Sequence, residues 1–128
     1  MFFEKSLTIP ANTPILTPEI VTLPVTEGTV ERVWVRWRWG SANLCGVRML
    51  YNSFQYWPLT IGGWFPSNAD ALEFAQAIPL MNDPFEVTIQ GYNLDDTYSH
   101  TVWVAFLIVR RDISENMKQF LRDLAGGS

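Results

Sequence analysis

Residues capable of acid–base chemistry gather in one short segment, DDTYSH at 95–100, which contains His100, the only histidine of the chain. A histidine held by a carboxylate can act as a general base, and that pairing requires Asp95 or Asp96 to fold back onto the ring. Ser99 is a poor nucleophile for this base, because neighbouring residues of a strand point to opposite faces. The sequence therefore predicts a protein that is not an enzyme and has no catalytic residues.

Metal and cofactor sites have equally little support. One histidine and one cysteine, Cys45, cannot build a multi-histidine site or a thiolate cluster. Calcium needs about six oxygen ligands, and the segment at 95–100 offers only two adjacent carboxylates. The chain has no GxxxxGK, GxGxxG or GxSxG motif. We therefore expect no metal and no cofactor, and we expect Cys45 to be a small buried hydrophobic residue.

A binding surface has better support, in the segment ERVWVRWRWG at 31–40, with its three tryptophans and three arginines. Side chains alternate between the two faces of a strand. One face then holds Glu31 at its end, followed by residues typical of a core: Val33, Val35, Trp37 and Trp39. The other face holds Arg32, Trp34, Arg36 and Arg38. Same-face neighbours lie about 7 Å apart, so the two nearest guanidinium groups are within reach of the Trp34 ring.

Two interpretations of the arginine face remain open. It is either a solvated face with one partly covered tryptophan, or a protein interface, since arginine and tryptophan are enriched at binding hot spots. In a chain of net charge −4, an interface of this kind would need an acidic counterpart. A head-to-tail contact between copies would supply one from Asp95, Asp96, Glu86 or Glu73.

A second aromatic group flanks a loop rich in glycine and proline. Its members are Tyr56, Trp57, Trp64 and Phe65. Such rings can stack on sugars, insert into a neighbouring subunit or close the end of their own sandwich, and the sequence leaves all three open.

The elements that must position these residues are strands. Alternating or apolar runs separated by turn residues predict about eight of them, at residues 3–9, 19–25, 30–39, 44–51, 54–58, 71–80, 85–92 and 100–111. Residues 71–80 also suit a helix, but a strand is preferred because Asn82-Asp83-Pro84 indicates a turn into the next strand. Without helical crossovers, the pattern predicts an all-β, antiparallel two-sheet sandwich, with a jelly roll as first choice.

The period changes after residue 111. Apolar residues at 113, 117, 120, 121 and 124 form one stripe of a 3.6-residue repeat, and Asp112 with Glu115 resembles a capping box. The sequence thus predicts a β-sandwich domain over 1–111 and a short C-terminal amphipathic helix and tail over 112–128. The stripe, which includes Met117, Phe120 and Leu121, either lies on its own sandwich or docks on a neighbouring subunit.

Composition bounds the function classes. A chain of 128 residues is one domain, and 48% hydrophobic against 17% charged residues excludes a disordered chain. The net charge of −4 disfavours nucleic acid and anionic membranes as partners. The first residues lack the features of a signal peptide, and no apolar run is long enough to span a bilayer, so cytosolic synthesis is expected.

Several strand-and-turn patterns carry a family resemblance: SLTIPANTP, VERVWVRW, FQYWP and GYNLDDTYSHTVWV. Over residues 6–109 the chain resembles small one-domain jelly-roll or β-sandwich structural proteins of viruses, such as phage-like capsid decoration or minor capsid proteins. The resemblance implies a virion component, made in the host cytoplasm, that works by assembling. It supplies no catalytic residues.

The residues and the resemblance together predict a structural protein that forms a homo-oligomer, a trimer or pentamer, and contacts a major capsid protein. The expected interface comprises Arg32, Trp34, Arg36, Arg38, Met117, Phe120 and Leu121. The alternative is a carbohydrate-binding module whose platform is formed by Tyr56, Trp57 and Trp64.

Overall fold

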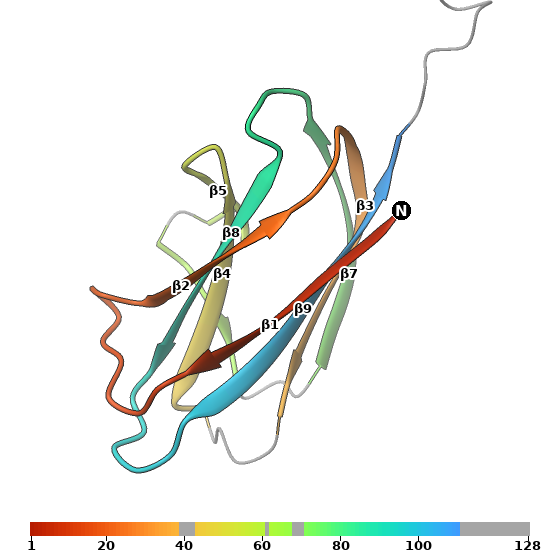
Figure 1. Ribbon diagram of the computed structural model, residues 1–128. Coiled ribbons are helices and arrows are strands. Elements are labelled where there is room, and N and C mark those ends of the chain that lie inside the picture. The colour runs from red at the N-terminus through yellow and green to blue at the C-terminus, as the bar shows by residue number, and fades with distance from the viewer. Residues whose placement is uncertain (39–42, 61, 68–70, 111–128) are drawn as a thin grey trace, which may run out of the picture.

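The computed structural model describes residues 1–38, 43–60, 62–67 and 71–110. Their regular secondary structure consists of nine β-strands, which form two antiparallel sheets packed face to face (Figure 1). The strands are β1 (Phe2–Ile9), β2 (Glu19–Pro24), β3 (Gly28–Trp37), β4 (Cys45–Tyr51), β5 (Phe54–Trp57), β6 (Phe65–Pro66), β7 (Ala71–Leu80), β8 (Glu86–Asn93) and β9 (His100–Val109). The predicted all-β, two-sheet sandwich is confirmed. The additional strand is the two-residue β6, which lies in the predicted loop.

The chain passes repeatedly between the two layers. The four-stranded sheet has the order β1-β9-β3-β7, and the five-stranded sheet has the order β2-β8-β4-β5, with β6 also paired to β4. Figure 1 shows the first set side by side in one layer and the second set in the other. Strands β1 to β4 alternate between the layers, as do β7 to β9, so strands that pair within a sheet are often distant in sequence.

The core lies between the sheets and follows from side-chain alternation. In β9, Val102, Val104, Phe106 and Ile108 are all fully buried. This strand lies between β1 and β3, and Phe106 packs edge-on against Trp57 with ring centroids 5.0 Å apart. Each large apolar side chain buried in this way contributes about 1.5–3 kcal/mol.

A β-bulge modifies the predicted alternation of β3. Val30 and Val33 are both fully buried although three positions separate them. The register of β3 shifts between Val30 and Arg32 against both neighbouring strands. Against β9 the extra residue is Glu31, whereas against β7 the extra residue belongs to β7 itself, between Ala75 and Ile78. Beyond it the predicted alternation holds, and Val35 and Trp37 point into the core.

One local prediction is confirmed, and the turn between β4 and β5 has a defined type. Residues 71–80 form a strand, β7, which pairs with β3 at the edge of its sheet. Asn52 and Ser53 join β4 to β5 with φ angles of 51° and 66°, as a two-residue hairpin turn of type I′ requires.

Three predicted features lie outside the described residues: Trp39, the C-terminal stripe of Met117, Phe120 and Leu121, and the helix that carries it. Within the described part of the chain, no helix has the length and apolar character needed to cross a membrane.

Candidate binding surface

The outer face of the four-stranded sheet carries the predicted arginine face of β3. Arg32, Arg36 and Arg38 are exposed and Trp34 is half-buried, whereas Trp37 on the opposite face is 4% exposed. The register pairs Trp34 with Ala105 of β9, and Arg36 with Trp103 of β9. Pairing with β9 therefore brings a tryptophan from the far end of the sequence beside the predicted arginines.

Three aromatic side chains from three strands meet on this face. Phe2 of β1 contacts Trp34 of β3 at 5.6 Å and Trp103 of β9 at 6.3 Å between ring centroids. Strand β9 lies between β1 and β3, so Phe2 and Trp34 meet across it, where the small Ala105 leaves them room. Ala105 points outward by register, and yet it is fully buried. We call Phe2, Trp34 and Trp103 the aromatic ridge.

The arginines do not use Trp34 as the sequence suggested. The Arg36 guanidinium carbon lies 5.7 Å from the centroid of the Trp103 ring. Arg32 instead forms an ion pair with Glu73 of β7, with 2.7 Å between Nη1 and Oε1. Glu73, one of the acidic residues expected to meet a neighbouring copy, is thus engaged within its own chain.

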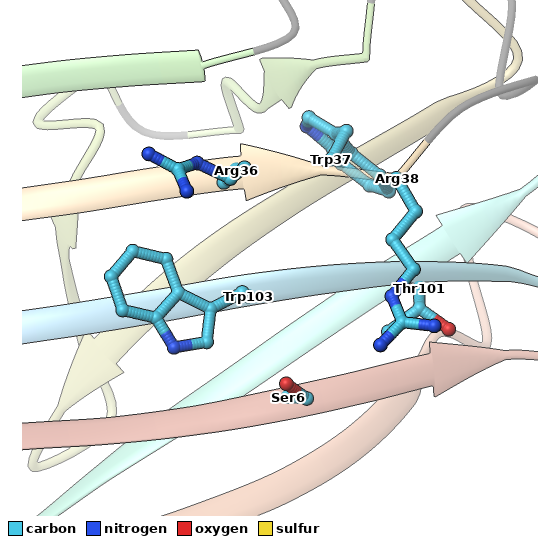
Figure 2. Close-up of a pocket in the computed structure, with 6 residues that line it drawn as sticks. All are labelled: Ser6, Arg36, Trp37, Arg38, Thr101 and Trp103. Atoms are coloured by element: carbon cyan, nitrogen blue, oxygen red, sulfur yellow. The ribbon is translucent and has the colours of Figure 1, made fainter.

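A hollow of about 700 Å³ lies at one end of the aromatic ridge. Figure 2 shows Arg36 projecting from β3, Arg38 from the residue that directly follows it, Thr101 and Trp103 from β9, and Ser6 from β1. The Trp103 ring lies flat over the sheet with one face turned to the viewer, and the Arg38 side chain reaches across toward Thr101 (Figure 2). We call this depression the arginine hollow; its lining residues are Ser6, Arg36, Trp37, Arg38, Thr101 and Trp103.

The arginine hollow is rich in uncompensated hydrogen-bond donors. In the described part of the chain, neither Arg36 nor Arg38 has a carboxylate partner. Of the two lining hydroxyls, that of Thr101 is hydrogen-bonded to Thr8 at 3.0 Å. Glu4 supplies a carboxylate beside the hollow, because its Oε2 accepts a 3.3 Å hydrogen bond from Trp103 Nε1. Among the described lining residues, the charge without a carboxylate partner is therefore that of Arg36 and Arg38.

The loop aromatics are not brought together as an exposed platform. Trp57 is fully buried in the core, so its predicted place in a sugar-binding platform is wrong. Tyr56 is half-buried between Phe54 and Trp57. Phe65 contacts Phe74 of β7, with 5.4 Å between ring centroids.

Trp64 belongs to a separate cluster on the outer face of the five-stranded sheet. Its ring meets Tyr92 edge-on at 4.9 Å, and the Arg48 guanidinium lies 4.3 Å from its centroid. The Arg48 Nε donates a 2.7 Å hydrogen bond to Gln90 Oε1. The Tyr92 ring covers Gly46, where an added methyl group would lie only 2.3 Å from a ring carbon. We call Arg48, Trp64, Tyr92 and Gln90 the Arg48 cluster.

The candidate acid–base pair does form. His100 Nε2 lies 2.8 Å from Asp95 Oδ2, and the two side chains are 6% and 13% exposed. The other carboxylate oxygen, Oδ1, accepts hydrogen bonds from the backbone N–H groups of Thr97 and Tyr98. These contacts, the hydrogen bond from His100 foremost, lower the pKa of Asp95. The pair closes the β8–β9 loop on itself.

The buried amide of Asn93 was missed by sequence reasoning, because GYNL resembles an ordinary turn. Asn93 is fully buried, and its Nδ2 donates to the carbonyl oxygens of Ile9 and Tyr98. Its Oδ1 accepts from the Asp95 backbone N–H and from the thiol of Cys45. Cys45 is fully buried, as predicted, and burial raises the pKa of its thiol to about 12.

Gln55 is a second buried amide that the sequence did not reveal. Its Nε2 lies within hydrogen-bonding distance of the carbonyl oxygens of Pro58, Thr60 and Gly63, and its Oε1 accepts from the Gly62 N–H. The loop after β5 is therefore organised around one side chain.

Comparisons with protein-family models and with curated proteins find no match. Among the described residues, no group of three or more histidine, cysteine, aspartate or glutamate side chains is arranged to hold a metal ion. The argument for function therefore depends on the two outer faces.

Proposed function

We propose that this protein is a structural component of a virus particle that acts by assembly and not by catalysis. Its contact surface is the aromatic ridge with the flanking arginines, on the outer face of the four-stranded sheet. Its first partners are copies of itself, in a trimer or pentamer, together with a major capsid protein.

The strand order supports the finer fold assignment. Sheets ordered β1-β9-β3-β7 and β2-β8-β4-β5 arise when two Greek keys are wound together, which is the arrangement of a jelly roll. Jelly rolls recur in viral capsid proteins, but also in lectins and cupins, so the fold alone does not decide the function.

The observation that carries the proposal is the aromatic ridge. All three rings lie on the outer face of the sheet and are in contact with solvent: Phe2 is 51% exposed, and Trp34 and Trp103 are half-buried. Leaving a contiguous aromatic surface in water costs free energy, and such surfaces mark contact sites when polar residues border them. The border here includes Arg36 and the Arg32–Glu73 ion pair. This is the composition typical of interface hot spots.

Sedimentation velocity of the full chain at micromolar concentration tests the proposal. We expect a discrete oligomer whose formation is weakened by Phe2→Ala or Trp34→Ala, because truncating a hot spot costs about 2 kcal/mol or more. Phe54→Ala is the matched control, since Phe54 is a similarly exposed ring (48%) on the other sheet.

A strictly monomeric protein that also fails to bind the capsid shell would overturn the assembly role. An oligomer that is equally sensitive to Phe54→Ala would retain assembly but move the contact away from the ridge.

A further inference from the structure

The arginine hollow carries positive charge that no carboxylate among the described residues neutralises. Two arginines of β3, Arg32 and Arg36, and Arg38 directly after it project on the outer side of the sheet, and their situations differ. Arg32 is held by Glu73 at 2.7 Å, whereas Arg36 and Arg38 have no carboxylate partner in the described part of the chain. The two unpaired guanidinium groups border the same hollow. An acidic group is therefore the ligand chemistry that this hollow lacks.

A carboxylate is the anion that fits the two unpaired arginines. A guanidinium group presents planar pairs of N–H donors that match the two oxygens of a carboxylate. Arg36 of β3 and Arg38 directly after it lie on the same side of the sheet, about 7 Å apart at the backbone, so two long side chains can close on one group between them.

The rest of the hollow shows that the ligand is more than a carboxylate. A volume of about 700 Å³ falls in the range of small-molecule sites, far above what one carboxylate fills. The lining also includes the flat face of Trp103 and the hydroxyls of Ser6 and Thr101 (Figure 2). A flat apolar surface beside hydroxyl groups is complementary to a sugar ring, which has an apolar C–H face and a hydroxyl rim.

We propose that the arginine hollow binds a sugar acid of monosaccharide size, such as a uronic acid. The carboxylate lies between Arg36 and Arg38, the apolar face of the pyranose packs on Trp103, and ring hydroxyls meet Ser6 and Thr101. This site goes beyond the assembly role. It also differs in its residues from the loop platform, of which Trp57 is a core residue.

Isothermal titration calorimetry of the full chain with D-glucuronate tests the site. We expect glucuronate to bind, and glucose, which lacks the carboxylate, to bind about tenfold more weakly or worse. Arg36→Ala and Arg38→Ala should each weaken glucuronate binding by about tenfold, the loss expected for one charged hydrogen bond. Arg32→Ala is the matched control and should leave the affinity unchanged, because Arg32 is paired with Glu73 outside the hollow. Circular dichroism spectra confirm that each variant is folded.

Titrations with other ligands distinguish a sugar-acid site from a general anion site. Trp103→Ala should weaken glucuronate binding but not acetate binding, since only the ring contact is lost. Equal affinity for acetate, sulfate and glucuronate would reduce the hollow to an unspecific anion site. Tighter binding of benzoate would replace the sugar with an aromatic acid. No binding, or binding unaffected by Arg36→Ala and Arg38→Ala, would overturn the inference.

Sedimentation of the same samples keeps this inference distinct from the assembly role. The contact surface and the hollow share Arg36 and Trp103, so the titration is repeated on protein diluted until it is monomeric. Monomer that binds no glucuronate, from a protein that oligomerises at higher concentration, would overturn the sugar-acid site alone. A monomer that binds glucuronate would overturn assembly alone.

Discussion

Both outer faces of the sandwich place an arginine against a tryptophan, but in different surroundings. In the Arg48 cluster the guanidinium lies 4.3 Å from the Trp64 ring centroid, and its Nε is hydrogen-bonded to Gln90. On the four-stranded sheet, Arg36 lies 5.7 Å from the Trp103 centroid and has no carboxylate partner among the described residues. The first pair is held by its own chain, and the second remains available.

The hollows that the two arginines border also differ. Arg48 borders a hollow of about 320 Å³ whose described lining contains no second arginine. Arg36 shares a hollow of about 700 Å³ with Arg38. Residue types alone therefore do not distinguish a structural cluster from a binding surface. The deciding feature is whether neighbouring side chains already satisfy the charged group.

The largest expected effect concerns Gly46, which the Tyr92 ring of the Arg48 cluster covers. Gly46→Val would push a side chain into the Tyr92 ring, since even a methyl group would come within 2.3 Å of it. Because the atoms met are at the far end of the partly exposed Tyr92 side chain, which can move aside, we expect a loss of about 1–2 kcal/mol in the free energy of unfolding, measured by urea denaturation. Ala75→Val, at an exposed position of the other sheet, is the control and should change stability by less than about 0.5 kcal/mol. Equal losses at both positions would remove the structural role from the cluster.

A smaller effect separates the two arginines directly. Arg48→Ala should cost about 1 kcal/mol, because it removes a hydrogen bond to Gln90 and a cation–π contact. Arg36→Ala should cost less than about 0.5 kcal/mol, because this side chain is exposed and makes the looser ring contact. If urea denaturation showed a larger stability loss for Arg36→Ala than for Arg48→Ala, then Arg36 would be the structural arginine and Arg48 the available one.

Part of the structure of the candidate face could be predicted from the sequence. Alternation alone assigned Val33, Val35 and Trp37 to the core and the arginines to the surface, because the period of a strand is a local property. The β-bulge at Glu31 was not predicted, since no residue there distinguishes a bulge from a continuous strand. Its effect, the burial of both Val30 and Val33, depends on pairing with two other strands.

The sequence could not predict which side chains contact one another on this face. Trp103 lies 67 positions after Arg36, and only the β3–β9 register brings them together. The same limit affected Trp57 and Trp64, two loop tryptophans that the sequence treats alike. Pairing of β5 with β4 turns Trp57 into the core, whereas Trp64 ends on the outer face against Tyr92. Contacts made across long sequence separations decide the site.

Within the arginine face, the Arg32–Glu73 pair predicts a still smaller effect. Both side chains are about half exposed, so the ion pair should contribute less than about 1 kcal/mol. Arg32→Glu should destabilise the protein by placing two like charges on neighbouring strands, and the double variant Arg32→Glu/Glu73→Arg should restore most of the loss. Urea denaturation at low and high salt measures both, and high salt should shrink the difference. Failure of the double variant to recover would mean that Arg32 is not neutralised by Glu73.

The last prediction concerns Asp95, the carboxylate that pairs with His100 in the β8–β9 loop. The hydrogen bond from His100 and those from the backbone lower the pKa of Asp95 below its ordinary value of 3.8. A group whose folded-state pKa is lowered adds stability that is fully present above the unfolded-state pKa and disappears as pH falls through the folded-state pKa. Stability should therefore decline at pH below about 4, and Asp95→Asn should flatten that decline. Asp96→Asn makes the same charge change without the His100 contact, so an equal flattening in both variants would show that overall charge, and not the buried pair, sets the acid limit.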